Sequence, residues 1–278
     1  MYEGRMSDKN HLCFEIDEGV GIVTFNRPEQ LNAITWDLAS DLVQLFRDLR
    51  FEDAVHTVLL TGEGKAFSAG ADAEWISGGS DRPLPGLSDL PIARYQRKSP
   101  AGPFVEFTRA IVALEKPVIA AIPGPAMGAG LAYALACDRR FGDTNARMCA
   151  AFVRLGFSPD SGVSYFLPRI TNLPTALMMV ETGKILDAQA SKEAGLLDEL
   201  VEEGKAFGAA LAYAKKLAAG PSVAIDLGRR FIYKALTSSL DEMLDYEAVA
   251  GTMAAHTSDA REGTSAFIEK RKPRFTGV

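Results

Sequence analysis

Two short segments of small residues have the composition of backbone turns that bind negative charge. Residues 66–72 read AFSAGAD, and residues 123–131 read PGPAMGAGL. Each segment follows a run of β-forming residues and leads into a sequence compatible with a helix, so each is predicted to be a strand-to-helix turn. The first N–H groups of a helix have no partner within it and favour negative charge. Together, the two turns could hold one developing oxyanion.

Two simpler explanations of the second segment can be weighed. A dinucleotide-binding fingerprint would need Gly or Ala where Tyr133 stands, so the sequence does not fit that motif. Glycines are also common where a helix and a strand approach closely, and Gly128 and Gly130 could serve that purpose alone. For the functional interpretation only backbone N–H groups are needed, and Ala129 can supply one at the start of a helix.

The candidate proton-transfer group is Asp160, which lies in the sequence FSPDSGVSY at residues 157–165. A carboxylate becomes a base near neutral pH when apolar surroundings raise its pKa. Phe152, Phe157 and Phe166 are close in sequence, although this does not prove that they shield it. The alternative is a helix N-cap or turn residue, since Pro-Asp-Ser-Gly before a helical run is a common turn sequence.

Composition argues against several classes of function. The 278 residues carry a net charge of −6 and no block of lysine or arginine, so neither nucleic acid nor a membrane surface is the expected partner. Three widely spaced cysteines predict neither a disulfide framework nor a metal cluster. The N-terminus has no apolar signal core, and Pro and Gly interrupt the apolar run at 117–135. The expected location is cytoplasmic.

The elements around these residues alternate between strands and helices. A hairpin is predicted from strands 12–16 and 21–25, and helix 35–51 follows with Thr35 as its N-cap. The chain is then expected to continue through these elements: strand 55–61, a short helix near 71–77, helix 103–114, strand 117–122, helix 129–136 and strand 137–141. This alternation predicts an α/β fold.

Two regions differ from this pattern. Residues 76–103 contain too many prolines and glycines for regular structure and are interpreted as a lid over the substrate. After residue 205 the chain is predicted to be almost entirely helical. The predicted division is therefore a core with the ligand site at 1–204 and a helical oligomerisation or cap region at 205–278.

The order of five segments resembles the enoyl-CoA hydratase/isomerase (crotonase) superfamily. They are residues 67–72, 116–122, 128–130, 136–138 and 265–272. The resemblance covers about residues 12–275. It implies a spiral of strand-strand-helix (ββα) turns followed by C-terminal helices that build trimers, often paired into hexamers. The implied ligand is an acyl-CoA thioester, with no separate cofactor and no metal.

The resemblance also implies site residues. The thioester oxygen would accept hydrogen bonds from the N–H groups of Ala71 and Ala129. Positions that contact coenzyme A in the family correspond to Ala69 and Asp72, near the adenine and pantetheine, and to Phe267 and Lys270, near the nucleotide end and commonly across a subunit boundary.

Departures from the family pattern bear on the reaction. Family hydratases carry two glutamates where this chain has Ala132 and Phe152, whereas Asp160 matches the acid of single-carboxylate isomerases. We therefore expect an isomerase that shifts a double bond of an enoyl-CoA. A hydrolase, a dehalogenase or an atypical hydratase remains an alternative, as does a silent acyl-CoA-binding protein. The directions of Tyr133 and Tyr165 are not fixed by the sequence.

Overall fold

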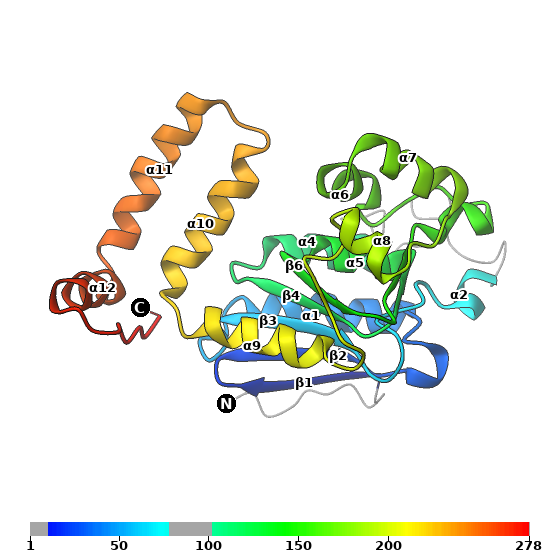
Figure 1. Ribbon diagram of the computed structural model, residues 1–278, viewed down its shortest axis with the longest axis horizontal. Coiled ribbons are helices and arrows are strands. Elements are labelled where there is room, and N and C mark those ends of the chain that lie inside the picture. Colours follow the sequence, from blue (N-terminus) through cyan, green and yellow to red (C-terminus); the bar gives the residue numbers. More distant parts are fainter. Residues whose placement is uncertain (1–10, 78–101, 278) are drawn as a thin grey trace, which may run out of the picture.

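The computed structural model describes residues 11–77 and 102–277, and a six-stranded sheet forms its centre (Figure 1). In order of pairing, the strands are β1 (Leu12–Asp17), β2 (Val20–Phe25), β3 (Thr57–Gly62), β4 (Val118–Ile122), β6 (Arg139–Asp143) and β8 (Glu199–Val201). Strands β1 and β2 are antiparallel, and the other neighbours are parallel. A smaller sheet pairs β5 (Pro125–Met127) with β7 (Arg147–Cys149). Successive turns of the chain thus give one strand to each sheet.

Helices follow these strands on both sides of the large sheet. Those before residue 200 are η1 (Pro28–Gln30), α1 (Trp36–Leu49), α2 (Ala73–Ser77), α4 (Gly102–Ala113), α5 (Ala129–Ala136), η3 (Ala151–Leu155), α6 (Val163–Ile170), α7 (Leu173–Thr182) and α8 (Ala188–Glu193). The chain then continues into α9 (Ala206–Ala218), α10 (Ser222–Ala235), α11 (Leu240–Ala255) and α12 (Ser258–Glu269). The predicted α/β order and helical C-terminal region are confirmed.

Local sequence features explain the hairpin of β1 and β2 and the start of α1. Asp17 pairs with Val20, so Glu18 and Gly19 form a two-residue turn with φ of 48° and 79°. Two positive φ values are typical of the hairpin turn that matches strand twist. Thr35 caps α1, because its hydroxyl oxygen accepts a hydrogen bond from the N–H of Leu38 at 3.2 Å. Both the predicted hairpin and the predicted cap are confirmed.

The middle of the sheet is buried on both faces. Every residue of β3 and β4 is buried. Because successive side chains of a strand point to opposite faces, Leu60 joins the core that contains α1, α4 and α5, whereas Leu59 packs with α9. Helix α9 presents Ala210 and Ala214 to the sheet, and these small side chains let the helix lie close to it (Figure 1).

Helices α10 and α11 extend away from the sheet as an arm, with α12 at its base near the C-terminus (Figure 1). Large apolar side chains on this arm are exposed, and they include Ile232, Leu236, Leu240, Leu244, Val249 and Met253. Helix α9 packs with the core, and the division predicted at residue 204 stays a prediction. No helix within the described residues is both long enough and apolar enough to cross a membrane.

Several predicted boundaries differ from the structure by one or two residues. Strand β3 begins at Thr57 rather than 55, because the N–H of Val55 closes a turn onto the carbonyl of Glu52. Strand β6 begins at Arg139 rather than 137, because the N–H of Cys137 still bonds to α5. The short helix predicted near 71–77 begins at residue 73. The proposed lid lies largely outside the described residues, and its ends belong to α2 and α4.

One ion pair joins α10 to the core. The Nε of Arg229 lies 2.7 Å from each carboxylate oxygen of Asp138, and these side chains are 9% and 15% exposed. Asp138 also accepts hydrogen bonds from the hydroxyl of Tyr233 at 2.7 Å and from the N–H of Val118 at 2.8 Å. This carboxylate therefore connects the start of β4, the end of α5 and the helical arm.

Replacing Asp138 with Ala is expected to lower the free energy of unfolding by about 3–5 kcal/mol, because the buried charge of Arg229 loses its partner. Glu115→Ala is the control: this carboxylate is 40% exposed and pairs with Arg50 at 2.6 Å and with Arg230 at 3.6 Å, whose side chains are 43% and 40% exposed. Its loss should cost less than about 1 kcal/mol. Urea unfolding followed by circular dichroism measures both values, and equal small losses would contradict the role of Asp138.

Candidate active site

In the first predicted turn, at residues 66–72, the N–H of Ala71 points away from the neighbouring backbone. The N–H of Ile34 donates to the carbonyl of Gly70 at 2.8 Å, and the N–H of Asp72 donates to the carbonyl of Ile34 at 2.9 Å. These bonds form a parallel bridge at Ala71. Because peptide groups alternate in direction along an extended segment, the N–H of Ala71 points away from Ile34. It donates to no acceptor within the described residues.

The second turn provides an equivalent N–H at the start of α5. Gly128 precedes the helix with a φ of 52°, and its own N–H donates to the carbonyl of Cys149 at 3.0 Å. Ala129 is the first helical residue, where no carbonyl of the same helix is available to its N–H. In residues 11–77 and 102–277 this N–H has no acceptor. The helix dipole adds partial positive charge at this end.

Backbone contacts hold the two turns together. The N–H of Ser68 donates to the carbonyl of Pro125 at 3.0 Å, and the N–H of Met127 donates to the carbonyl of Ser68 at 2.9 Å. A Cβ added at Gly70 would lie 2.8 Å from the oxygen of Met127 and 3.5 Å from the nitrogen of Ala129. The unpartnered N–H groups at 71 and 129 therefore belong to neighbouring backbone segments, as the sequence predicted.

Gly130 explains how the turns come so close. A Cβ at this position would lie 2.6 Å from the carbonyl oxygen and 2.8 Å from the Cβ of Ser68. Real Cβ atoms essentially never show such distances. The close-packing explanation of this glycine is thus correct, and it is compatible with an oxyanion site because the packing brings Ala129 beside the first turn.

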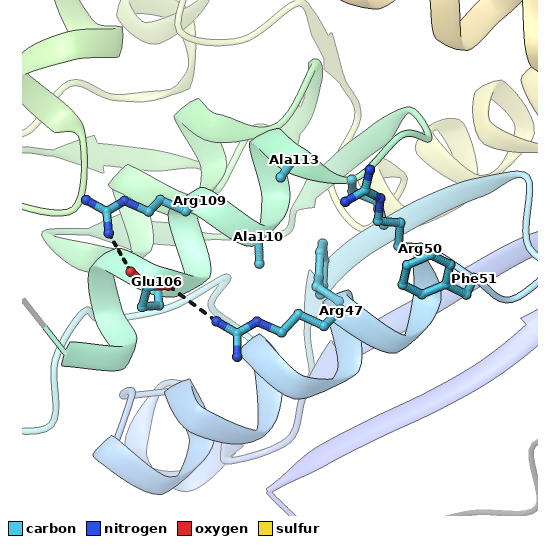
Figure 2. A pocket seen from close by; sticks show the side chains of 9 residues that line it. Arg47, Arg50, Phe51, Glu106, Arg109, Ala110 and Ala113 are labelled. Carbon is cyan, nitrogen blue, oxygen red and sulfur yellow. Dashed lines mark hydrogen bonds and ion pairs between the residues drawn. The ribbon is translucent and has the colours of Figure 1, made fainter. Parts of the chain in front are cut away.

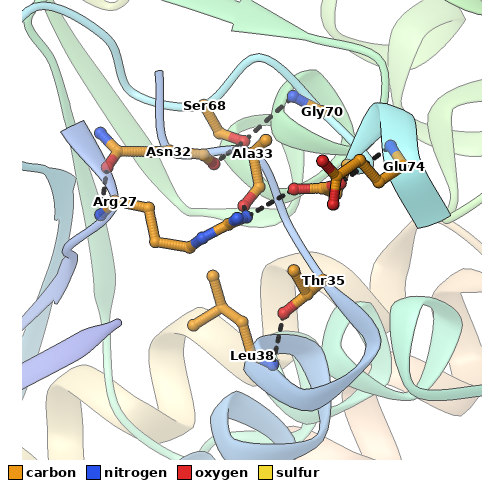
Figure 3. Close-up of polar contacts among 9 residues, drawn as sticks. Arg27, Asn32, Ala33, Thr35, Leu38, Ser68, Gly70 and Glu74 are labelled. Carbon is orange, nitrogen blue, oxygen red and sulfur yellow. Dashed lines mark hydrogen bonds and ion pairs between the residues drawn. The ribbon is translucent and has the colours of Figure 1, made fainter. Parts of the chain in front are cut away.

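Sequence reasoning missed two polar residues that support the first turn (Figure 3). Buried Asn32 donates from Nδ2 to the carbonyls of Ala66 at 2.7 Å and Glu63 at 2.9 Å. The hydroxyl of Ser68 donates to the carbonyl of Asn32 at 2.8 Å and accepts from the N–H of Gly70 at 3.1 Å. These bonds replace the regular pairing that an irregular buried backbone lacks. The position of Asn32 between two apolar residues is the sequence feature that could have identified its role.

Asp72 has a structural role beside Ala71. Its Oδ2 lies 2.8 Å from a guanidinium nitrogen of Arg27, and its Oδ1 accepts from the N–H of Glu74 at 3.0 Å (Figure 3). The residue is 8% exposed. Ala69 is exposed on the same turn. The structure places Ala69 and Asp72 next to the first oxyanion donor, and their contacts with coenzyme A stay predictions.

Asp160 is exposed in the turn that precedes α6. Gly162 is the N-cap of this helix and no side chain caps it, so the alternative that Asp160 serves as an N-cap is wrong. Its backbone carbonyl accepts from the N–H of Val163 at 3.0 Å, so Asp160 takes part in the turn, as the turn-residue alternative predicted. Phe157 is 49% exposed, whereas Phe152 and Phe166 pack against the core.

Helix α5 links the oxyanion turn to Asp160. Ala129 begins this helix, and Tyr133 lies one turn later with no exposed surface. Burial raises the pKa of the Tyr133 hydroxyl well above its ordinary value, and the negative charge of Asp160 raises it further. Helix α6, which follows the Asp160 turn, packs against α5, and this electrostatic effect agrees with a position of the carboxylate near α5. The position of the first hydratase glutamate is Ala132, also buried in α5, where no proton can be transferred.

Phe267 and Lys270 are not brought to this site. Phe267 is 85% exposed on α12, and Lys270 ends that helix with a φ of 54°. Figure 1 shows α12 at the opposite end of the molecule from α2, which follows the first turn. Within one chain, these two predicted coenzyme A contacts lie apart from the oxyanion donors.

A separate hollow of about 410 Å³ lies between α1 and α4 (Figure 2). Its cations are already paired: Glu106 lies 3.4 Å from Arg47 and 2.5 Å from Arg109, and Arg50 pairs with Glu115. Each arginine that lines the hollow therefore has a carboxylate within 3.4 Å, and Arg47 and Arg109 share Glu106. No group of three or more His, Cys, Asp or Glu within the described ranges could hold a metal ion.

Comparisons with known proteins agree with this geometry. Residues 15–278 match the family described as Enoyl-CoA hydratase/isomerase. The 1,2-epoxyphenylacetyl-CoA isomerase of Escherichia coli K12 is 33% identical over 96% of this chain and 98% of its own. The short-chain-enoyl-CoA hydratase of Clostridium acetobutylicum is 30% identical over 95% and 96%.

A solved structure of a putative enoyl-CoA hydratase from Streptomyces coelicolor A3(2) covers 100% of this chain and 98% of its own, with 33% identity and a TM-score of 0.88. This likeness confirms the predicted crotonase-like α/β fold with C-terminal helices. Relatives whose names denote hydratases and isomerases both match, so similarity alone does not distinguish the two reactions.

Gly130→Ala is expected to separate the two turns and to lower acyl-CoA turnover by roughly 10²- to 10³-fold, the effect of losing one oxyanion donor. Gly208→Ala is the matched control, because no atom lies within 4 Å of the added Cβ. It lies inside α9, where alanine should stabilise the helix by about 0.5–1 kcal/mol. Steady-state kinetics and thermal unfolding of both variants test this. Full activity of Gly130→Ala would contradict the site.

Proposed function

Because the chain belongs to the enoyl-CoA hydratase/isomerase (crotonase) family, whose members act on acyl-CoA thioesters, we propose that it is an enoyl-CoA isomerase. The thioester oxygen accepts hydrogen bonds from the N–H groups of Ala71 and Ala129, and Asp160 is the acid and base. The observation that carries this proposal is the position of Asp160 near α5, the helix that begins with Ala129.

The reaction needs one carboxylate. Asp160 removes a proton from the carbon α to the thioester of a β,γ-enoyl-CoA, and the electrons move into a dienolate whose oxygen lies between the two N–H groups. The protonated Asp160 then returns the proton to the γ-carbon, which moves the double bond into conjugation. Each N–H donor stabilises the developing charge by roughly 3–4 kcal/mol.

Hydration by the family's two-glutamate route has no support in this chain. Ala132 and Phe152 stand where the resemblance places the two glutamates, and neither side chain can position or activate water. Isomerisation avoids this need because no water is added: one proton leaves the α-carbon and one proton enters the γ-carbon. We therefore favour isomerase chemistry over hydratase chemistry.

A second candidate is isomerisation of a ring epoxide carried on a CoA thioester. The relative from Escherichia coli with 33% identity is named 1,2-epoxyphenylacetyl-CoA isomerase. An epoxide opening would use the same oxyanion donors and the same carboxylate. Hydrolysis, dehalogenation or atypical hydration would instead add an oxygen atom to the product, so labelled water distinguishes these reactions from either isomerisation.

We further propose that the protein assembles as a homotrimer or hexamer through its C-terminal helices. Exposed Leu240 and Val249 on α11, at 74% and 73%, are apolar surface that a partner would cover. A neighbouring copy would also explain the exposed Phe267 and Lys270, which lie away from the oxyanion donors of their own chain. They would contact the nucleotide end of coenzyme A bound to that neighbour.

Asp160→Asn is expected to lower turnover of a β,γ-enoyl-CoA by about 10²- to 10⁴-fold, because one proton-transfer group is lost. Affinity for the thioester should change little. The assay follows conjugated enoyl absorbance and deuterium uptake in deuterated water, with straight-chain β,γ-enoyl-CoA thioesters and 1,2-epoxyphenylacetyl-CoA as substrates.

Glu203→Gln, an exposed carboxylate before α9, is the control and should retain full activity. Wild-type turnover that survives in Asp160→Asn would contradict the assignment of the acid and base. Binding of every thioester without conversion or α-proton exchange would favour a silent acyl-CoA-binding protein.

A further inference from the structure

Two buried hydroxyl groups in the region of α5 and the Asp160 turn have no hydrogen-bond partner among the described residues. They belong to Tyr133 on α5 and to Ser161, the residue after Asp160. Tyr133 has no exposed surface, and Ser161 is 2% exposed. Buried polar groups are normally hydrogen-bonded, so an unpartnered pair beside a candidate proton-transfer group calls for a functional explanation. Neither the Tyr133 hydroxyl nor the Ser161 hydroxyl donates a hydrogen bond to a described residue.

The geometry directs Tyr133 toward the oxyanion end of α5. It follows Ala129 by four residues, so both lie on one face of the helix. Long side chains of helical residues lean back toward the N-terminus. The Tyr133 ring packs edge-on against Phe107 of α4, with centroids 4.7 Å apart and an interplanar angle of 78°. This contact fixes the ring within the core.

The turn that carries Asp160 is fixed against the same helix α4. The hydroxyl of Thr108 donates to the carbonyl of Ser161 at 2.8 Å. Ser161 and Gly162 both have positive φ, 50° and 93°, so the chain turns at these two residues before α6 begins. Helix α4 thus holds the phenol ring through Phe107 and the carboxylate-bearing turn through Thr108.

The phenol is able to donate a hydrogen bond at neutral pH. Burial and the charge of Asp160 both raise the pKa of Tyr133, so it keeps its proton. Among the described residues, Asp160 is the charged group with a resolved effect on this hydroxyl. The protonated phenol can donate a hydrogen bond to a carboxylate, and the exposed carboxylate of Asp160 is the charge that acts on it. Among the described residues, however, the phenol has no hydrogen bond.

We propose that Tyr133 is a positioning residue for Asp160. When an acyl-CoA is bound, its hydroxyl donates a hydrogen bond to one carboxylate oxygen, and the other oxygen faces the α-carbon of the thioester. The α-proton moves to that second oxygen, while Tyr133 keeps its own proton. This inference rests on the proposed role of Asp160 and deepens it. A base that is already correctly oriented needs less reorganisation during the reaction.

Tyr133→Phe removes the hydroxyl and keeps the ring contact. We expect kcat to fall about 10- to 100-fold, the effect of losing a hydrogen bond to a charged group, while KM changes less than about twofold. The Tm should not decrease, because this hydroxyl has no partner in the free protein. The matched control is Tyr165→Phe, where the ring is 43% exposed and lies over Arg169. It should leave kcat unchanged.

A double-mutant cycle tests whether Tyr133 acts through Asp160. In the Asp160→Asn background, Tyr133→Phe should change the residual rate by less than about twofold, because the coupled partner is already altered. An equal loss in both backgrounds would overturn the proposal, as would full kcat in the single Tyr133→Phe variant. A lowered Tm would also overturn it, because the hydroxyl would then be bonded in the free protein.

A spectroscopic measurement separates this proposal from the proposed isomerase activity. Protein labelled with ¹³C-tyrosine is mixed with acetoacetyl-CoA, whose enolate carries charge on the thioester oxygen, and the infrared difference spectrum is recorded. A C–O band that shifts to a hydrogen-bonded position in wild type, and not in Tyr133→Phe or Asp160→Ala, supports the bond even if no thioester is isomerised. Absence of the shift in ligand-saturated wild type overturns it.

Discussion

Two backbone hydrogen bonds between Ser68 and the β5 segment connect the chemistry of this protein to its fold. They run from Ser68 to Pro125 and from Met127 to Ser68, at 3.0 and 2.9 Å. Without them, the N–H groups of Ala71 and Ala129 would belong to two independent loops. Because the bonds use backbone atoms alone, the side chains around them must be small enough to permit the approach, and Gly130 meets that requirement.

The remaining core supports this junction in two ways. The middle of the large sheet is buried on both faces, with α9 on one side and α1, α4 and α5 on the other, so β3 and β4 hold the turns that follow them in place. Irregular backbone next to a sheet needs its own hydrogen bonds. Asn32 and Ser68 supply them for the first turn, and Asp72 connects that turn to Arg27 and α2.

The two backbone N–H groups proposed to stabilise charge and the carboxylate proposed to transfer a proton come from different parts of the chain. Because those donors are backbone groups, the proposed role of Ala71 and Ala129 does not depend on their side chains. In this proposal the choice of reaction depends on nearby side chains, with a carboxylate at Asp160 and none at Ala132. This separation explains how one family fold can accommodate relatives named as hydratases and as isomerases.

The sequence by itself determined the elements and the two turns, because hydrophobic period, caps and glycine-rich turns are local properties. It also identified Asp160 as the proton-transfer candidate, with an N-cap role still open. Only tertiary structure showed that Gly162 caps α6 instead, that Tyr133 lies buried near Asp160, and that Phe267 lies away from Ala71 in the same chain. These facts depend on contacts between segments distant in sequence, and no local pattern specifies such contacts.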